Sequence, residues 1–249
     1  MPIRPSWKKA ATTPIMPPGE RIYAIGDIHG RFDLLYRLIS AILDDVTKRP
    51  MARTRFVVLG DFIDRGPDSA KIIEVLTALH LDERMIVLKG NHEAALVEGV
   101  RGDRAALDAW IEYGGDATLR SFGAHEDDIW PADTRMLIGN VRRIIPEPVI
   151  NWLAELPVTH RAGSYLFVHA GIKPGVAMTR QSADDLMGIR DEFTQSELDH
   201  GAIVVHGHTV SDRVCFRPNR IGVDTGAYRT GRLSAVGLEA SEQWTVEAA

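Results

Sequence analysis

The sequence has little cysteine and no long apolar run. Cys215 is the single cysteine among 249 residues, so an intramolecular disulfide is excluded. No apolar stretch approaches the roughly 20 residues that a membrane span needs. Residues 1–20 carry basic side chains and several prolines but lack the apolar core of a secretory signal, so they predict a mobile lead-in. These absences fit a reducing compartment, and we expect a cytoplasmic protein.

An excess of positive charge is also missing. The chain has 29 Lys and Arg against 34 Asp and Glu, a net charge of -5. This argues against a protein that binds nucleic acid through a large basic face. We therefore expect neither nucleic acid nor a membrane as a partner, and we expect a monomer. The chain is long enough to bury the core of one large α/β domain, which we place at residues 21–249.

Strand and helix patterns alternate through the first part of the chain. Residues 21–27, 55–61 and 84–90 predict buried strands, and helical periodicity follows each of them. Strands that alternate with helices predict a mostly parallel sheet with helices on both faces. Residues from about 99 to 156 are mainly helical, and we expect them to form a cap over a site. The remaining third returns to strands.

Side chains suited to metal binding recur where the expected strands end, each beside a glycine. The ends carry GDIHG at 26–30, GDFIDRG at 60–66, GNHE at 90–93, VHAG at 168–171 and HGHT at 206–209. Ligands bind at such strand ends in open α/β sheets. A lone Asp after a strand is more often a helix cap. Five strand ends with the same chemistry instead predict a metal centre, and mixed oxygen and imidazole donors suit Mn²⁺, Fe or Zn²⁺.

Other phosphate and hydrolytic chemistries lack their residues. Cys215 is not part of a Cys-x5-Arg loop, because Ile221 stands at the arginine position. The loop of a P-loop nucleotide enzyme is missing. Asp224 begins an Asp-Thr-Gly sequence like that of an aspartic protease, but no second copy exists to complete a carboxylate pair. We expect this segment to close a strand near the metal centre.

The motifs GDIHG, GDFIDRGPDS, GNHE, VHAG and HGHT, in this order, closely resemble those of the phosphoprotein phosphatase family, which lies within the calcineurin-like metallophosphoesterases. The resemblance runs from about residue 21 to the final strands. It implies a four-layer α/β sandwich, in which two mixed β-sheets are flanked by helices. It also implies two divalent metal ions as cofactors, which we expect to be Mn²⁺, with Fe or Zn²⁺ as alternatives.

The resemblance assigns the metal ligands by motif: Asp27, His29 and a bridging Asp61 at the first ion, with Asn91, His169 and His208 at the second. In HGHT the family's ligand precedes the threonine, so His208 is the expected ligand and His206 its neighbour. Val210 stands where many nuclease-like relatives carry a further metal-binding histidine. Valine at this position favours the phosphatase branch.

The same resemblance implies roles for four other residues. His92 adjoins a ligand and can protonate the leaving oxygen, and Asp64 is expected to orient it. Arg65 and Arg190 are expected to bind the phosphate, because a guanidinium forks onto its oxygens. Residues 112–123 resemble a cap segment of bacterial members and are expected to shape substrate access, although core packing explains most of this segment equally well.

The function expected from these motifs is that of a bacterial serine/threonine protein phosphatase, acting by direct attack of a metal-bridging hydroxide. The alternative is a bis(5'-nucleosyl)-tetraphosphatase, which resembles this family in every metal-site motif. A non-catalytic metal-binding module would require a broken site, and no motif is broken. Aromatic and basic residues in the expected cap could serve a polyphosphate substrate. Trp110 and Trp152, however, lie in apolar helical patterns where a core role is expected.

Overall fold

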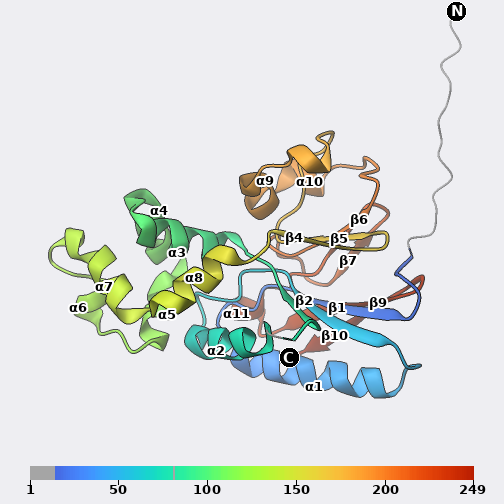
Figure 1. The fold of residues 1–249 in the computed structure, drawn as a ribbon, viewed down its shortest axis with the longest axis horizontal. Coiled ribbons are helices and arrows are strands. Elements are labelled where there is room, and N and C mark those ends of the chain that lie inside the picture. The colour runs from blue at the N-terminus through green and yellow to red at the C-terminus, as the bar shows by residue number, and fades with distance from the viewer. Residues whose placement is uncertain (1–14, 81) are drawn as a thin grey trace, which may run out of the picture.

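A computed structural model describes residues 15–80 and 82–249. Two five-stranded sheets pack against each other, and helices cover the outer face of each (Figure 1). The first sheet has the order β10-β9-β1-β2-β3, and the second has the order β4-β5-β6-β8-β7. Parallel and antiparallel neighbours occur in both sheets. The expected four-layer sandwich of two mixed sheets is confirmed.

The strands are short. The first sheet contains β1 (Glu20–Ile25), β2 (Arg53–Val58), β3 (Met85–Val87), β9 (Leu233–Glu239) and β10 (Glu242–Ala248). The second sheet contains β4 (Thr159–Ala162), β5 (Tyr165–Val168), β6 (Ile203–His206), β7 (Cys215–Arg217) and β8 (Arg220–Gly222). Because β1, β2 and β3 run parallel, their carboxyl ends lie at one edge of the first sheet.

Alternation along the strands separates the layers. In β1, Ile22 and Ala24 face the second sheet, and Tyr23 and Ile25 face helices on the outer side. This follows from the two-residue period of a strand, which sends successive side chains to opposite faces. The outer helices are α1 (Phe32–Thr47) and α2 (Ser69–His80) on the first sheet, with α9 (Ala183–Gly188) and α10 (Asp191–Thr194) on the second. Two short elements, η3 (Met178–Arg180) and α11 (Ala227–Thr230), complete this part.

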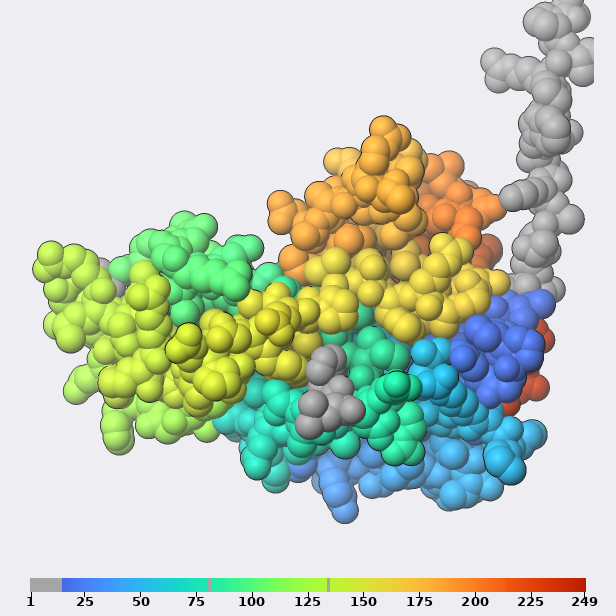
Figure 2. All heavy atoms as spheres, in the orientation of Figure 1, coloured from blue at the N-terminus to red at the C-terminus, as the bar shows by residue number. Residues whose placement is uncertain are grey.

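Residues 91–155 form a group of helices that we call the helical lobe. Its elements are α3 (Asn91–Arg101), α4 (Arg104–Trp110), the π-helix η1 (Ile111–Gly115), α5 (Asp116–Ser121), α6 (Glu126–Ile129), η2 (Thr134–Met136), α7 (Leu137–Ile144) and α8 (Glu147–Glu155). Figure 2 shows the lobe projecting from one end of the sandwich, in green and yellow. Its apolar residues join the same core as those of α1 and α2. The residues expected to form a cap are therefore helical and packed on the sandwich.

The expected mobile lead-in ended at residue 20. Residues 1–14 lie outside the part that the structure describes. From residue 15 the prediction is wrong, because Met16 is buried between the sheets and its N–H donates to the Ala240 carbonyl at 2.8 Å. The Ile15 amide also donates to the Ser164 hydroxyl at 3.1 Å. Of the helices described, none has the length and apolar character needed to cross a membrane.

Candidate metal centre

The structure brings the predicted ligands together at the carboxyl ends of strands from both sheets. Asp27 follows β1, Asp61 follows β2, and Asn91 opens α3 directly after the loop that ends β3. From the second sheet, His169 follows β5 and His208 lies two residues beyond β6. Five of the six predicted ligands are buried: Asp27, His29, Asp61, His169 and His208. Asn91 is partly buried.

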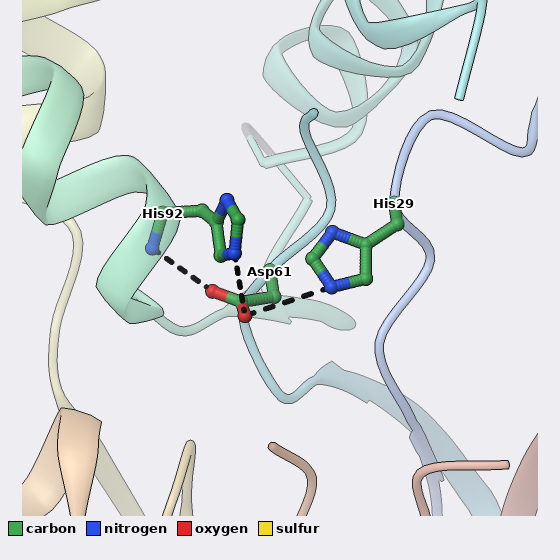
Figure 3. Close-up of side chains that lie close together, drawn as sticks. All are labelled: His29, Asp61 and His92. Carbon is green, nitrogen blue, oxygen red and sulfur yellow. Dashed lines mark hydrogen bonds and ion pairs between the residues drawn. The ribbon is translucent and has the colours of Figure 1, made fainter. Parts of the chain in front are cut away.

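Asp61 lies at the junction of two groups of side chains. Figure 3 shows His29 and His92 pointing toward its carboxylate from opposite sides, each with Nε2 at 3.8 Å from Oδ2. On the other side of the centre, His169 Nε2 lies 3.3 Å from the same oxygen. Asp61 therefore belongs to both groups with metal-binding geometry, one with His29 and His92 and one with His169 and His208. Such a shared carboxylate has the position that a bridging ligand requires.

The donor atoms converge in a way that suits a cation. His169 donates its Nδ1–H to the Leu59 carbonyl at 2.8 Å, so the lone pair of Nε2 faces the centre. That nitrogen lies 3.0 Å from Asn91 Oδ1 and 3.1 Å from His208 Nδ1. His169 Nε2, Asn91 Oδ1 and the Asp61 oxygen are acceptors, and acceptors this close repel one another unless a positive charge lies among them. The residues present therefore fit a bound metal ion.

The first group has the same arrangement. His29 donates its Nδ1–H to the Ile63 carbonyl at 2.9 Å, which leaves the Nε2 lone pair for the centre. Burial lowers the pKa of His29 to about 3 and that of His208 to about 3. Both imidazoles are therefore neutral near pH 7, which is the form that binds a metal.

Asp27 adds a second buried negative charge. Both of its oxygens accept the backbone N–H of His208, at 3.1 Å each, so it ties the end of β1 to the end of β6. Burial raises the pKa of the Asp27 carboxyl, and the charges of Asp224 and Asp61 raise it further. Asp27, Asp61 and Asp224 are thus three buried carboxylates that influence one another, which favours a site that holds cations. Asp27 belongs to neither three-residue group, so its role as a ligand stays a prediction.

His92, Asp64 and Arg65 form a connected set beside the centre. His92 donates Nδ1–H to Asp64 Oδ2 at 2.6 Å, which directs Nε2 toward the centre. Arg65 places one terminal nitrogen 2.9 Å from His92 Nε2 and the other 2.9 Å from His29 Nε2. Burial lowers the pKa of His92, but the charge of Asp61 and the hydrogen bond to Asp64 outweigh it and raise the pKa overall. This geometry suits a side chain that exchanges a proton with substrate.

Arg190 lies on the second sheet's side of the centre, directly before α10. Its positive charge contributes to the lowered pKa of His208, which places the guanidinium near that ligand. The side chain is exposed, and within the described residues it has no hydrogen bond or ion pair, including with the neighbouring Asp191 and Glu192. It is therefore available to an anion at the centre.

Two residues at the centre escaped sequence reasoning. Glu93 is fully buried, and its carboxylate accepts backbone N–H groups from the loops after β2 and β3, including those of Asp61 at 2.9 Å and Gly90 at 2.8 Å. The final letter of GNHE was a signal for it. Tyr228 of α11 stacks under Arg65, whose Cζ lies 4.6 Å from the ring centroid. Nothing in the sequence connects these two positions.

Unusual backbone geometry is concentrated here. Six described residues other than glycine have positive φ, and five of them are at the centre: His29, Asp61, Asp64, Arg65 and His208. Strained backbone of this kind persists where the surroundings enforce it, typically at functional sites. Glycines make the approach possible, because a Cβ at Gly90 would lie 2.2 Å from Asp61 Oδ1 and one at Gly207 would lie 2.1 Å from Asp27 Oδ1.

Known proteins resemble this chain in sequence. Residues 20–235 match the family model of the calcineurin-like phosphoesterases. The symmetrical bis(5'-nucleosyl)-tetraphosphatase of Methylococcus capsulatus is 28% identical over 223 residues, which cover 85% of this chain and 68% of that protein. Serine/threonine-protein phosphatase 2 of Escherichia coli is 26% identical over 223 residues, which cover 86% and 90%. With three further tetraphosphatases the match spans less than half of the relative's length.

The fold has solved counterparts. The crystal structure of a candidate diadenosine tetraphosphatase has a TM-score of 0.65 at 22% identity, covering 94% of this chain and 97% of the other. A cold-active protein-tyrosine phosphatase from a Shewanella species has a TM-score of 0.55 at 18% identity, covering 93% and 83%. At these identities the likeness concerns the fold alone.

Proposed function

Because this chain belongs to the calcineurin-like phosphoesterase family, and is therefore a metallophosphoesterase, we propose that it hydrolyses phosphate monoesters on serine and threonine side chains of proteins. One observation carries the choice of substrate. Five of the six arginines of the helical lobe are engaged within the lobe instead of converging on the metal centre. A polyphosphate substrate would require several free cations along its path.

Local partners hold these arginines. Four form ion pairs with neighbouring carboxylates: Arg104 with Asp108, Arg120 with Glu126, Arg135 with Asp133 and Arg143 with Asp128. Arg142 donates to the Val100 carbonyl at 2.6 Å. Trp110 is buried as expected, so its ring is not available to stack on a base. These contacts support a site that recognises one phosphoryl group.

Two ions held at this centre would lower the pKa of a bound water and neutralise the phosphoryl oxygens. We propose Mn²⁺, with Fe or Zn²⁺ as alternatives, because the donors mix imidazole and carboxylate. The proposed ligands are Asp27, His29, Asp61, Asn91, His169 and His208.

Residues beside the ligands are proposed to bind the phosphoryl group and to protonate the leaving oxygen. Arg65 and Arg190 would hold the phosphoryl oxygens, since both guanidinium groups face the centre or lie beside it. His92 would give a proton to the leaving oxygen, while Asp64 keeps its ring in place. Metal binding and proton transfer are thus assigned to separate residues.

A second candidate is symmetrical dinucleoside tetraphosphate hydrolysis. It is favoured by the relative from Methylococcus capsulatus, which is 28% identical over 85% of this chain. That activity would use the same centre. It differs in requiring a place for a nucleoside and for a longer phosphate chain.

Parallel rate measurements separate the two. We expect kcat/KM to be higher for a phosphothreonine peptide than for diadenosine tetraphosphate, and EDTA to abolish both rates. A preference of about tenfold or more for the dinucleotide, equal to about 1.4 kcal/mol of transition-state stabilisation, would overturn the proposed substrate and leave the metal centre intact. Failure to hydrolyse either substrate with Mn²⁺, Fe or Zn²⁺ would overturn the proposed function.

A further inference from the structure

The helical lobe reaches into the site through Asp64. This side chain is fully buried, and its carboxylate has three donors. Oδ2 accepts both His92 Nδ1–H at 2.6 Å and the indole N–H of Trp110 at 2.8 Å. Oδ1 accepts the hydroxyl of Thr118 at 2.6 Å. The Asp64 backbone N–H in turn donates to the hydroxyls of Thr118 and Ser69, each at 3.0 Å. Two lobe residues therefore fix the orientation of this carboxylate.

The lobe's own structure holds Trp110 and Thr118 in place. Trp110 ends α4 and is 1% exposed, and Thr118 lies in α5 and is fully buried. Between them, in η1, the chain kinks at Gly114, whose φ of 111° is not helical. A Cβ at Gly115 would lie 2.4 Å from the indole ring, so only glycine allows the ring to occupy this position.

The same segment contacts the neighbouring arginine. The Gly114 carbonyl accepts the backbone N–H of Arg65 at 3.0 Å, and the Tyr113 carbonyl accepts its Nε–H at 3.4 Å. A Cβ at Gly114 would lie 2.7 Å from Arg65 Cγ. Residues 110–118 therefore contact both residues that the loop after β2 contributes beside the metal centre.

We propose that Trp110 and Thr118 are positioning residues for phosphate ester hydrolysis, which hold the Asp64 carboxylate against His92 Nδ1 so that Nε2 of His92 faces the leaving group. The proposal rests on the proposed roles of His92 and Asp64. A carboxylate with only one donor could rotate about its side-chain bonds and release the imidazole. Three donors from three helices, α3, α4 and α5, remove that freedom. The lobe thereby contributes to the proton-transfer geometry, in addition to any effect on substrate access.

Matched variants at Thr118 provide the test. Thr118→Val removes the hydroxyl with little change in volume, and Thr118→Ser keeps it. Trp110→Phe removes the indole N–H. We expect Thr118→Val and Trp110→Phe to lower kcat on phenyl phosphate by about 10- to 100-fold, the range for losing a hydrogen bond to a charged group. The loss should be several-fold smaller on p-nitrophenyl phosphate, whose leaving group needs no proton. Thr118→Ser should stay near wild type, with metal content unchanged in all variants.

Equal losses on the two esters, or an equal loss in Thr118→Ser, would show a merely structural role and overturn the proposal. If Trp110→Phe does not fold, the Thr118 pair decides. If wild-type protein hydrolyses neither these esters nor a phosphothreonine peptide, the proposed function fails, and a spectroscopic readout still tests the positioning. In Zn²⁺-loaded protein, the NMR signal of the His92 Nδ1 proton, assigned with His92→Asn, should shift in Thr118→Val and not in Thr118→Ser. An unchanged signal in Thr118→Val would also overturn the proposal.

Discussion

The position of Asp61 at the metal centre could be predicted from the sequence around it. It ends a run of apolar strand residues beside Gly60, and the same pattern recurs at the ends of four other expected strands. Because the ends of parallel strands converge, the sequence could place these side chains together before any coordinates were known. The structure agrees in the case of His206 as well. This histidine lies in neither ligand group and packs its ring against Phe193, with centroids 5.1 Å apart.

Other residues could not be predicted because their roles depend on contacts distant in sequence. Tyr228 meets Arg65 only because α11 folds back over the loop after β2. Asp27 gives no local sign that its carboxylate would accept the backbone N–H of His208, which lies 181 positions away. Local patterns report strand ends and helix faces, whereas such contacts are created by the packing of one sheet on the other.

The separate roles of neighbouring residues give a prediction at this scale. His92→Asn should leave metal content near wild type and lower kcat by about 10²- to 10⁴-fold, the range for losing a general acid. The loss should be smaller on p-nitrophenyl phosphate, because nitrophenolate leaves without a proton. Metal analysis and kinetics on the purified variant provide the check. Loss of metal from this variant would make His92 a ligand, as its proximity to Asp61 allows.

At the scale of elements, sequence patterns predicted the helices of the lobe but not their contacts with the site. Apolar periodicity predicted helices and a core position for Trp110, and both are found. The periodicity could not show that the buried indole N–H meets the carboxylate of Asp64, because a core tryptophan and a positioning tryptophan have the same pattern. The sequence also did not show that the chain kinks at Gly114 against Arg65, because that contact is distant in sequence.

Helix α1 and strand β10 are joined by a polar cluster that gives a prediction about stability. Asp45 accepts hydrogen bonds from Arg49 at 2.8 Å, Trp244 at 2.9 Å and the hydroxyl of Tyr23 at 2.5 Å. Asp45→Asn should therefore lower the free energy of unfolding by about 1–3 kcal/mol at pH 7. Urea denaturation measures this, and Asp44→Asn on the exposed side of α1 is the matched control, for which we expect little change.

The pH dependence of that difference follows from the Asp45 carboxyl. Burial raises its pKa, but the hydrogen bonds from Arg49, Tyr23 and Trp244 outweigh burial and lower it below the usual value of 3.8. Because the pKa is lower in the folded state, the stabilisation is complete above 3.8 and is lost as the pH falls through the folded-state value. The gap between wild type and Asp45→Asn should therefore narrow below about pH 4. A constant gap down to pH 3 would contradict this account.

The whole molecule is organised around a centre to which both sheets contribute. Asp27 and Asp61 follow strands of the first sheet, and His169 and His208 follow strands of the second. The sequence could predict a metal centre at this edge because each strand end carries ligand-type residues beside a glycine. It could not show which charged side chains of the lobe are paired, because these ion pairs depend on how the lobe's helices pack.

Because the proposed ligands come from both sheets, metal binding should stabilise the whole fold. A cation that binds only the folded chain should stabilise it by about 2.7 kcal/mol at a concentration 100 times its Kd. For a domain of this size, that corresponds to a rise in Tm of about 5–10 °C between EDTA and saturating Mn²⁺. Differential scanning calorimetry measures the shift. Asp61→Asn should show little of it, and an equal shift in that variant would indicate binding elsewhere.

The central claim is that one carboxylate is shared by two ions, and metal stoichiometry tests it most directly. Wild-type protein and Asp61→Asn would be dialysed against the same Mn²⁺ solution and their metal content measured by mass spectrometry. The shared position of Asp61 predicts about two ions per chain in the wild type and weakened binding of both in the variant, because each loses the same ligand. Wild-type metal content in Asp61→Asn, or the loss of one ion with the other held at wild-type affinity, would contradict it.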